Sequence, residues 1–407
     1  MSEIKQMSKF IWVLYFPGML FQLSMGLTTP ILPTFIGEFE SNIALIGLGV
    51  SSLIIGSTIF NLPAGMIAGK LNYKMTMFIS VILMAILSFL TAFAESYQTF
   101  FLLRFFTGAI SSVWGVAQLA YISKMVISNQ RGKTVAAYGG SHRIGLFLGP
   151  ILGGLIGVHL NLSMVFIIQS IIIGTILLII IFGLKETINS NEKNSKYNIF
   201  SLQETFKENT KKFGLGGPTI ISLQLLREGR KLLVPLLGTI IGLRVDQIGF
   251  IIGAAAILDA LMFIPTGFMM DKFGRKFFSV PCLLILSLGF LLLPLAKTTG
   301  VFFAVVLLMG FGNGLGSGAV MILGTDFTPK KKSAEFLGIW KFIGDAGGAS
   351  GPIIIGQLMN AFTFGISSAS VALIGFFGGI WHLLMVPETL KKTDISHKLK
   401  DNIKDDI

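Results

Sequence analysis

The chain has 407 residues, of which 53% are hydrophobic and 13% are charged. Soluble domains carry about 25% charged residues, so this composition excludes an ordinary soluble domain and predicts an integral membrane protein. The formal net charge is +12 and the single cysteine is Cys282, which excludes an intramolecular disulfide and a cysteine-cluster metal site.

Twelve apolar runs follow one another along the chain, each long enough to span a hydrocarbon core of about 30 Å. They lie near residues 11–36, 43–68, 75–94, 100–123, 134–158, 164–184, 217–241, 247–270, 277–296, 301–324, 336–358 and 366–386. The first run shows no small-residue cleavage site, so we interpret it as a span and not as a signal peptide. Pro30 and Pro33 are expected to bend or loosen its end.

These runs predict an all-α membrane protein with two six-helix bundles, over residues 1–184 and 217–390. A polar, lysine-rich cytoplasmic linker at 185–216 joins them, and a charged cytoplasmic tail covers 391–407. Within the linker, residues 199–212 form either a short amphipathic helix or a plain solvated segment.

The basic residues indicate how the chain crosses the membrane. Most of the 32 Lys and Arg lie at the two ends and in the even-numbered loops, whereas the odd-numbered loops hold Arg244 and Lys297. By the positive-inside rule both termini are cytoplasmic and the protein lies in the cell membrane. The positive charge is therefore a topology signal, and we expect no nucleic-acid partner.

An unusual glycine-rich segment, HRIGLFLGPILGG at 142–154, has a counterpart in GDAGGASGPIIIG at 344–356. Glycine and proline at this density are tolerated in membrane helices, where small residues let two backbones approach closely. We expect helix packing at Gly145, Gly149, Pro150, Gly154, Gly347, Gly351 and Pro352. The same offset of 202 residues relates Pro33 to Pro235 and Gly47 to Gly249, so the two bundles are copies of one unit related by a pseudo-twofold axis.

Ionisable residues inside membrane spans are costly, and a functional role is the first hypothesis for them. They are Arg104, His142, Arg143, Arg227, Glu228, Arg230, Lys231, Asp259, Lys341 and Asp345, and Trp114 and Gln118 join them as candidates for a central substrate cavity. Arg143 and Asp345 occupy equivalent positions in the repeat, so we expect them to face each other. The alternative for each residue is an internally paired side chain that only holds helices together.

Proton coupling needs a carboxylate that can gain and lose a proton, and the candidates are Asp259, Asp345 and Glu228. Basic residues flank Glu228, whereas Asp259 has no charged neighbour within one helical turn. We therefore expect Asp259 to be the proton carrier. The cations of the expected cavity outnumber its carboxylates, which favours an anionic or zwitterionic substrate unless ion pairing absorbs the excess.

The segment GFMMDKFGRK at 267–276 resembles the cytoplasmic loop signature of the major facilitator superfamily. GLFLGPILGG at 145–154 is similar to a fifth-span signature of its proton-coupled exporters, and Arg104 in LLRFFTGA is similar to its fourth-span arginine. The resemblance covers essentially the whole chain and is closest to the drug:proton antiporter branch. It implies two six-helix bundles around a central cavity that opens alternately to the two sides of the membrane.

The two halves depart from this family pattern in different ways. Asp271, Arg275 and Asp326 match the cytoplasmic charge relay of the family, but their repeat partners are Gly69, Tyr73 and Lys124. We expect the cytoplasmic gate to be strongest in the second half, with the basic residues Lys124, Arg131 and Lys133 opposite Asp326 and Glu335. The alternative is that these loop charges only set topology.

The sequence thus predicts a secondary active transporter that exports small amphipathic molecules, drugs or an endogenous metabolite, in exchange for protons. The second hypothesis is proton-coupled uptake or exchange of a small organic anion, and the third is a receptor or enzyme on a transporter-like scaffold. A nucleotide-binding loop and a metal-binding His/Cys spacing are absent from the sequence. We therefore expect no enzymatic activity, cofactor or metal, and we expect a monomer whose partners are its substrate, protons and the lipid bilayer.

Overall fold

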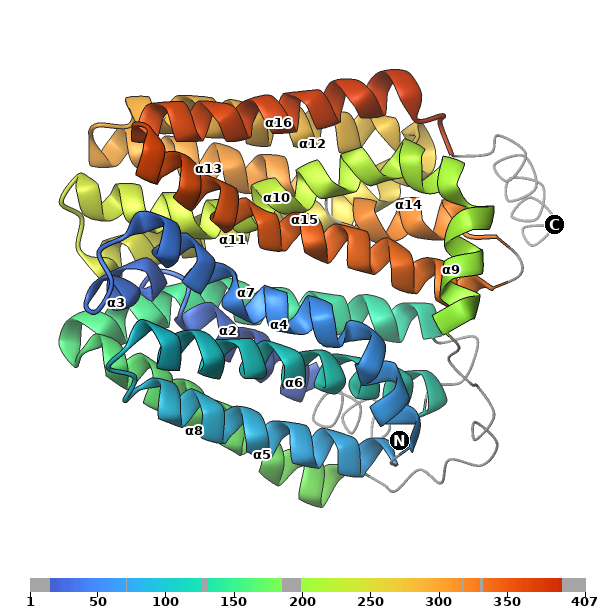
Figure 1. Ribbon diagram of the computed structural model, residues 1–407, viewed down its shortest axis with the longest axis horizontal. Coiled ribbons are helices and arrows are strands. Elements are labelled where there is room, and N and C mark those ends of the chain that lie inside the picture. Colours follow the sequence, from blue (N-terminus) through green and yellow to red (C-terminus); the bar gives the residue numbers. More distant parts are fainter. Residues whose placement is uncertain are drawn as a thin grey trace, which may run out of the picture.

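A computed structural model describes residues 15–70, 72–125, 131–184, 199–316, 318–329 and 332–389, and the elements of these ranges are helices. The long helices run side by side along the longest axis of the molecule (Figure 1). The N-terminal half contains α2 (Phe16–Leu27), α3 (Leu32–Gly37), α4 (Ile43–Lys70), α5 (Tyr73–Thr91), α6 (Tyr97–Met125), α7 (Arg131–His159) and α8 (Leu162–Gly183).

The C-terminal half repeats this arrangement above the first half in Figure 1. It contains α10 (Thr210–Ile240), α11 (Val245–Phe273), α12 (Lys276–Leu292) with the 3₁₀ turn η4 (Leu293–Leu295), α13 (Thr299–Leu315), α14 (Ala319–Phe327), α15 (Ser333–Ala361) and α16 (Phe364–Met385). The linker forms a helix, α9 (Ile199–Glu208), which lies across one end of the molecule. We call this the α9 end.

Two of the expected spans are each split into two helices. The first span breaks between α2 and α3 at residues 28–31, where Pro30 has no N–H to continue the helical hydrogen bonds. The tenth span breaks between α13 and α14, where Gly318 adopts a φ of +86°, a conformation that costs glycine little.

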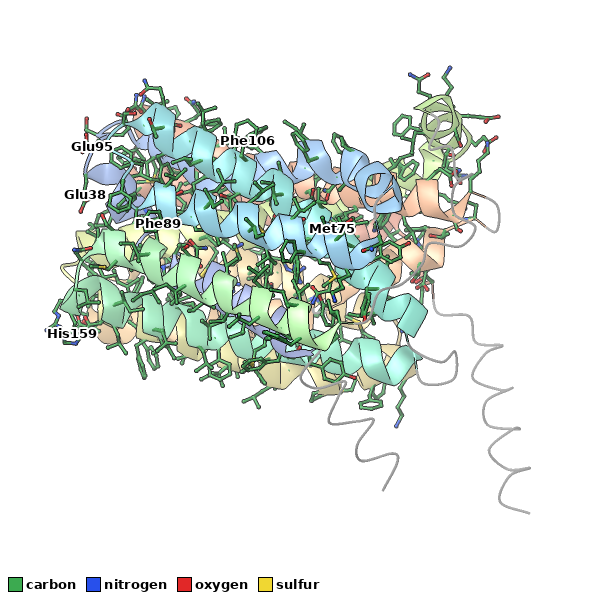
Figure 2. All side chains as sticks on the ribbon, turned by 90° about the horizontal axis from the view of Figure 1, so that it is seen from below. Glu38, Met75, Phe89, Glu95, Phe106 and His159 are labelled. Carbon is green, nitrogen blue, oxygen red and sulfur yellow. The ribbon has the colours of Figure 1, made fainter. Side chains whose placement is uncertain are left out.

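Within the described ranges, nine spans are long and apolar enough to cross a membrane by length and composition. Besides the interrupted α2–α3 pair, the long helices α10 and α15 fall outside this set; both contain charged, polar and glycine residues among their apolar ones. Large apolar side chains such as Met75, Phe89 and Phe106 point outward along the flank of the molecule, whereas Glu38, Glu95 and His159 lie at the end opposite α9 (Figure 2). An apolar flank between polar ends fits a multi-pass membrane protein.

Glycine positions let the helices of each half pack closely against one another. A Cβ at Gly149 of α7 would lie 2.6 Å from the Cα of Gly26, and a Cβ at Gly351 of α15 would lie 2.6 Å from the Leu225 carbonyl oxygen. Gly145 and Gly347 are in similar contact with the backbones of α2 and α10. A side chain at any of these four positions would force two backbones apart.

The two halves contact each other where α4 crosses α15 and where α7 crosses α11. The crossings are related by the repeat: a Cβ at Gly47 would overlap the carbonyl oxygen of Pro352, and a Cβ at Gly249 would overlap that of Pro150. Gly154 lies in the second crossing, where a Cβ would be 2.7 Å from the Val245 carbonyl oxygen. These residues lie toward the end opposite α9, so the two halves are in backbone contact there.

Candidate functional site

Two adjoining cavities lie between the two halves and share the lining residues Gly26, Thr29, Leu146 and Lys231. The smaller, about 100 Å³, is also lined by Asp259 and Arg230, and we call it the Asp259 lobe. The larger, about 240 Å³, is also lined by Arg104 and Glu228, and we call it the Arg104 lobe. Together they form the central cavity, whose charged residues come from α6, α10 and α11.

An ion pair beside the Asp259 lobe joins the two halves. Nη1 of Arg143 on α7 lies 2.9 Å from Oδ1 of Asp259 on α11, and the two side chains are only 20% and 14% exposed. The Arg143 guanidinium also lies 4.0 Å from the centre of the Phe263 ring. The pair is therefore well shielded from solvent and depends on both halves.

The same carboxylate belongs to a polar chain within the C-terminal half. Asn313 Nδ2 donates to Asp259 Oδ2 over 2.6 Å, and Arg227 Nε donates to Asn313 Oδ1 over 2.8 Å. Arg227 also donates to Gln224 and to the carbonyl oxygen of Gly316. Arg227 is thus turned toward α13 and holds Asn313 in place.

The expectation that Arg143 and Asp345 face each other is wrong. Asp345 accepts a hydrogen bond from Asn61 Nδ2 of α4 over 2.6 Å and pairs with Lys341 one turn earlier on α15. Residues related by a twofold axis lie on opposite sides of that axis. Arg143 therefore contacts α11, which α7 crosses, and Asp345 contacts α4, which α15 crosses. Arg143 therefore meets Phe263 and Asp345 meets Asn61, two contacts that are themselves related by the 202-residue offset.

Asp259 has no charged neighbour within one turn of its own helix, but the other half of the chain provides one, Arg143. Glu228, by contrast, pairs as its sequence neighbours suggested: Lys231 Nζ lies 2.7 Å from its carboxylate. The Lys231 side chain is 48% exposed and lines both lobes.

The remaining cavity candidates differ in where the structure places them. Trp114 is buried against Phe21 in the core of the N-terminal half, and Gln118 accepts a 2.6 Å hydrogen bond from the Tyr138 hydroxyl. His142 contacts the Tyr138 ring and its carbonyl oxygen one turn earlier on α7. These three residues are held by the N-terminal half and do not line the two lobes.

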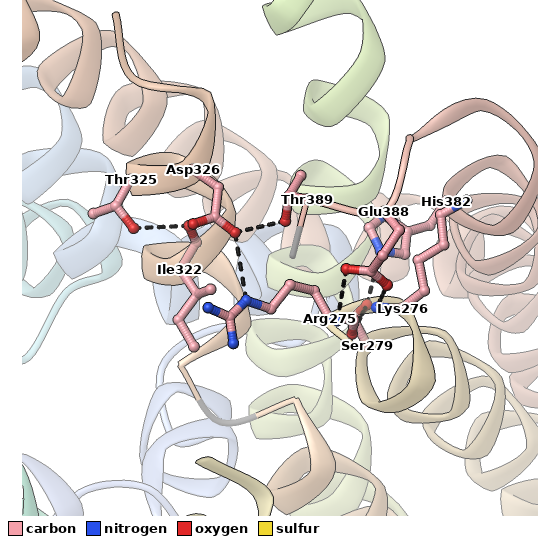
Figure 3. A network of polar contacts seen from close by, with 9 residues as sticks. All are labelled: Arg275, Lys276, Ser279, Ile322, Thr325, Asp326, His382, Glu388 and Thr389. Carbon is pink, nitrogen blue, oxygen red and sulfur yellow. Dashed lines mark hydrogen bonds and ion pairs between the residues drawn. The ribbon is translucent and has the colours of Figure 1, made fainter. Parts of the chain in front are cut away.

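A second polar cluster lies near the α9 end of the C-terminal half (Figure 3). Arg275 Nε lies 3.4 Å from Asp326 Oδ2, and the Thr389 hydroxyl donates to the same oxygen. Glu388 accepts hydrogen bonds from the backbone N–H groups of Arg275 and Lys276 at the start of α12, over 2.9 and 3.1 Å. The cluster therefore ties the segment after α16 to the loop between α11 and α12.

The expected gate between the halves falls largely outside the described residues. The side chains of four of its expected residues are not among those that the structure describes, namely Asp271, Lys124, Arg131 and Lys133. Glu335 accepts a 3.3 Å hydrogen bond from Ser201 of α9.

Lys332 joins α9 to the loop before α15. It adopts a left-handed φ of +58° and pairs with Glu204 over 2.8 Å and Glu208 over 3.2 Å. The hydrogen bond to Glu204 is the largest of the effects that raise the pKa of Lys332.

Sequence reasoning missed the amides Asn61 and Asn313 and the carboxylate of Glu388. The signal for the amides was present, since each is a lone asparagine inside an apolar run whose amide needs a partner in a membrane. Glu388 was visible only as a repeat partner of Glu186. Among the described residues, no three of His, Cys, Asp and Glu form a cluster that suits a metal ion.

The family model of the Major Facilitator Superfamily matches residues 14–230 and 220–403. An uncharacterised MFS-type transporter of Methanocaldococcus jannaschii is 22% identical over 368 residues, which cover 90% of this chain and 92% of the relative. The quinolone resistance protein NorA of Staphylococcus aureus is 28% identical over 148 residues, 36% of this chain and 38% of that protein.

Solved structures show the same fold at low sequence identity. A D-xylose–proton symporter superposes with a TM-score of 0.76 at 15% identity, over 94% of this chain and 98% of that one. A bacterial homologue of the human lysosomal transporter Spinster gives 0.74 at 14% identity, over 93% and 95%. With two six-helix repeats around a charged central cavity, the chain belongs to the Major Facilitator Superfamily of membrane transporters.

Proposed function

We propose that this transporter exports small amphipathic molecules in exchange for protons, by alternating access, as a monomer in the cell membrane with both termini in the cytoplasm. The observation that carries the proposal is the Arg143–Asp259 ion pair, which crosses from one half to the other beside the central cavity. The partial similarity to NorA, named for quinolone resistance, supports export.

Protonation of Asp259 gives this ion pair a role in coupling. While the carboxylate is ionised, it attracts the Arg143 guanidinium and holds α7 to α11. A proton that adds to the carboxylate cancels its charge, so the attraction across the interface is lost and the two halves separate more easily. Each 1.4 kcal/mol lost from one conformation changes a two-state population ratio about tenfold.

The Phe263 ring and Asn313 make this exchange of partners feasible. The Arg143 guanidinium keeps its contact with the ring when the carboxylate is neutral, so the cation is not left without a favourable neighbour. Asn313 holds the carboxyl group in place in both protonation states. Asp345 and Glu228 have nearby lysines in their own half, which makes them second candidates for the proton site.

The backbone contacts at Gly47 and Gly249 favour interpreting the described conformation as inward-facing. They seal the halves at the end opposite α9, which the positive-inside rule assigns to the outer side. Rocking of the two halves about the cavity would break these contacts and expose the cavity to the outside.

Uptake or exchange of an organic anion is the second candidate function. The specific observation in its favour is the positive charge of the cavity, where Arg104, Arg230 and Lys231 accompany Glu228 and Asp259. A measurement in proteoliposomes that hold a fluorescent quinolone separates the two. If the protein exports by exchange, protons and quinolone move in opposite directions under an imposed pH gradient; if it is a symporter, they move in the same direction. The absence of any gradient-dependent movement would refute both.

A further inference from the structure

Arg104 is a buried arginine that no side chain in the described ranges neutralises. It lies on α6, is 5% exposed and lines the Arg104 lobe. Its Nε atom has no hydrogen-bond partner, and among the described residues none forms an ion pair with the guanidinium. Arginine stays protonated in proteins, so the lobe contains a full positive charge for which the described part of the chain provides no counterion.

Four of the other polar side chains of the lobe are already engaged. The Glu228 carboxylate pairs with Lys231 over 2.7 Å, and the Ser111 hydroxyl donates to the Gly108 carbonyl oxygen. The Thr28 hydroxyl donates to the Met25 carbonyl oxygen in the same way. An unpaired buried charge is destabilising unless a partner arrives, and the Arg104 lobe, about 240 Å³ in volume, leaves room for one.

The fold itself does not require a charge at this position. The repeat partner of Arg104 is Val306, which occupies the equivalent place in α13, is 2% exposed and lines the Asp259 lobe. The same helix packs in the same way with an apolar residue there. The charge in the N-terminal half is therefore explained better by a ligand than by packing.

We propose that Arg104 binds a carboxylate of the transported molecule, so that the substrates are amphipathic organic acids or zwitterions. A planar guanidinium matches a carboxylate with two parallel hydrogen bonds. The apolar side chains of Phe21, Leu53 and Ile54, which line the same lobe, suit the hydrophobic body of such a molecule. This inference rests on the proposed transport function and adds the chemical class of the substrate to it.

A matched pair of probes tests this assignment: a fluorescent quinolone carboxylic acid and its methyl ester, which lacks the negative charge. Binding is measured by fluorescence in detergent, without a pH gradient. The wild-type protein should bind the acid about tenfold or more tightly than the ester, because the loss of a hydrogen bond to a charged group weakens binding by about tenfold or more. Equal affinities for the two probes would overturn the proposal without any variant.

Four variants locate the preference. Arg104→Gln should reduce the ratio of acid to ester affinity to about one, and Arg104→Lys, which keeps the charge but loses the bidentate geometry, should give an intermediate ratio. Arg244→Gln, at an exposed site outside the cavity, serves as the control and should keep the wild-type ratio. If Arg230→Gln removes the preference and Arg104→Gln does not, the assignment is wrong.

Ester transport under a pH gradient separates this inference from the proposed function. If the gradient drives the ester in wild type but the acid is not preferred, the carboxylate subsite is refuted and proton coupling stands. If neither probe responds to the gradient while the acid is preferred, proton coupling is refuted and the subsite stands. Should Arg104→Gln fail to fold, the wild-type ratio and Arg104→Lys decide the question.

Discussion

Replacing Arg143 by Gln, Asp259 by Asn and both together tests whether one ion pair couples the two halves. In each single variant one charge loses the ion pair that crosses between the halves. Removing one member of a fully buried pair costs about 3–5 kcal/mol. The side chains are 20% and 14% exposed, and each keeps at least one further neighbour, such as Asn313 for the aspartate and the Phe263 ring for the arginine. We therefore expect a loss of about 2–3 kcal/mol for each single variant.

The double variant should lose about 1–2 kcal/mol less than the sum of the two singles, because the pair interaction is removed only once. The free energy of unfolding in a mild detergent provides the measurement. The pair Arg143→Gln and Asp345→Asn is the matched control, since these residues share no partner among those described, and it should be additive within about 0.5 kcal/mol. Additivity for Arg143 with Asp259, or coupling of Arg143 with Asp345, would refute the reasoning.

Three further changes probe other parts of the structure. Gly249→Val would push a side chain into the Pro150 carbonyl oxygen. Overpacking of this kind costs about 1–3 kcal/mol and should shift the population roughly tenfold toward the state that is open at the end opposite α9. Distances between spin labels at that end should therefore increase, and an unchanged distance distribution would contradict the contact. Glu388→Gln removes the negative charge that accepts hydrogen bonds from two N–H groups at the start of α12. We expect the free energy of unfolding to fall by about 1 kcal/mol and hydrogen exchange at these two amides to become faster. Unaltered exchange would count against a stabilising role of Glu388 at this helix end. Lys332→Gly and Lys332→Ala both lose the ion pairs to α9, but glycine tolerates the left-handed φ of this residue and alanine does not. The glycine variant should therefore be more stable by about 1 kcal/mol in its free energy of unfolding. Equal stabilities would show that this backbone conformation is lost in both variants.

Much of the fold could be predicted from the sequence because membrane helices leave strong local signals. Apolar runs, loop charges and the repeat at 202 residues indicate the helices and their pairing into two halves. The exceptions have local causes, namely Pro30 in the first span and Gly318 in the tenth. The close glycine contacts of α7 and α15 were also within reach, since few other reasons exist for so much glycine in a helix.

The partners of the charged residues could not be predicted in the same way. A repeat shows which residues are equivalent, but contact depends on which helices cross, and α7 crosses α11 while α15 crosses α4. Arg143 therefore meets Asp259, 116 residues away, and not its repeat partner Asp345. That Arg104 has no ion-pair partner among the described residues was equally hidden, because its surroundings come from α2, α4 and α10 and not from its own sequence neighbours.

Proton-driven transport by the Asp259→Asn variant tests the central claim most directly. Wild-type protein and variant are reconstituted into vesicles with the fluorescent quinolone ester, and transport is measured under a pH gradient and, separately, as exchange down a concentration gradient. If Asp259 carries the proton, the variant loses gradient-driven transport and keeps exchange, because asparagine fills the same space and still accepts from Arg143 but cannot be ionised. Gradient-driven transport at the wild-type rate in the variant would show that the proton travels elsewhere.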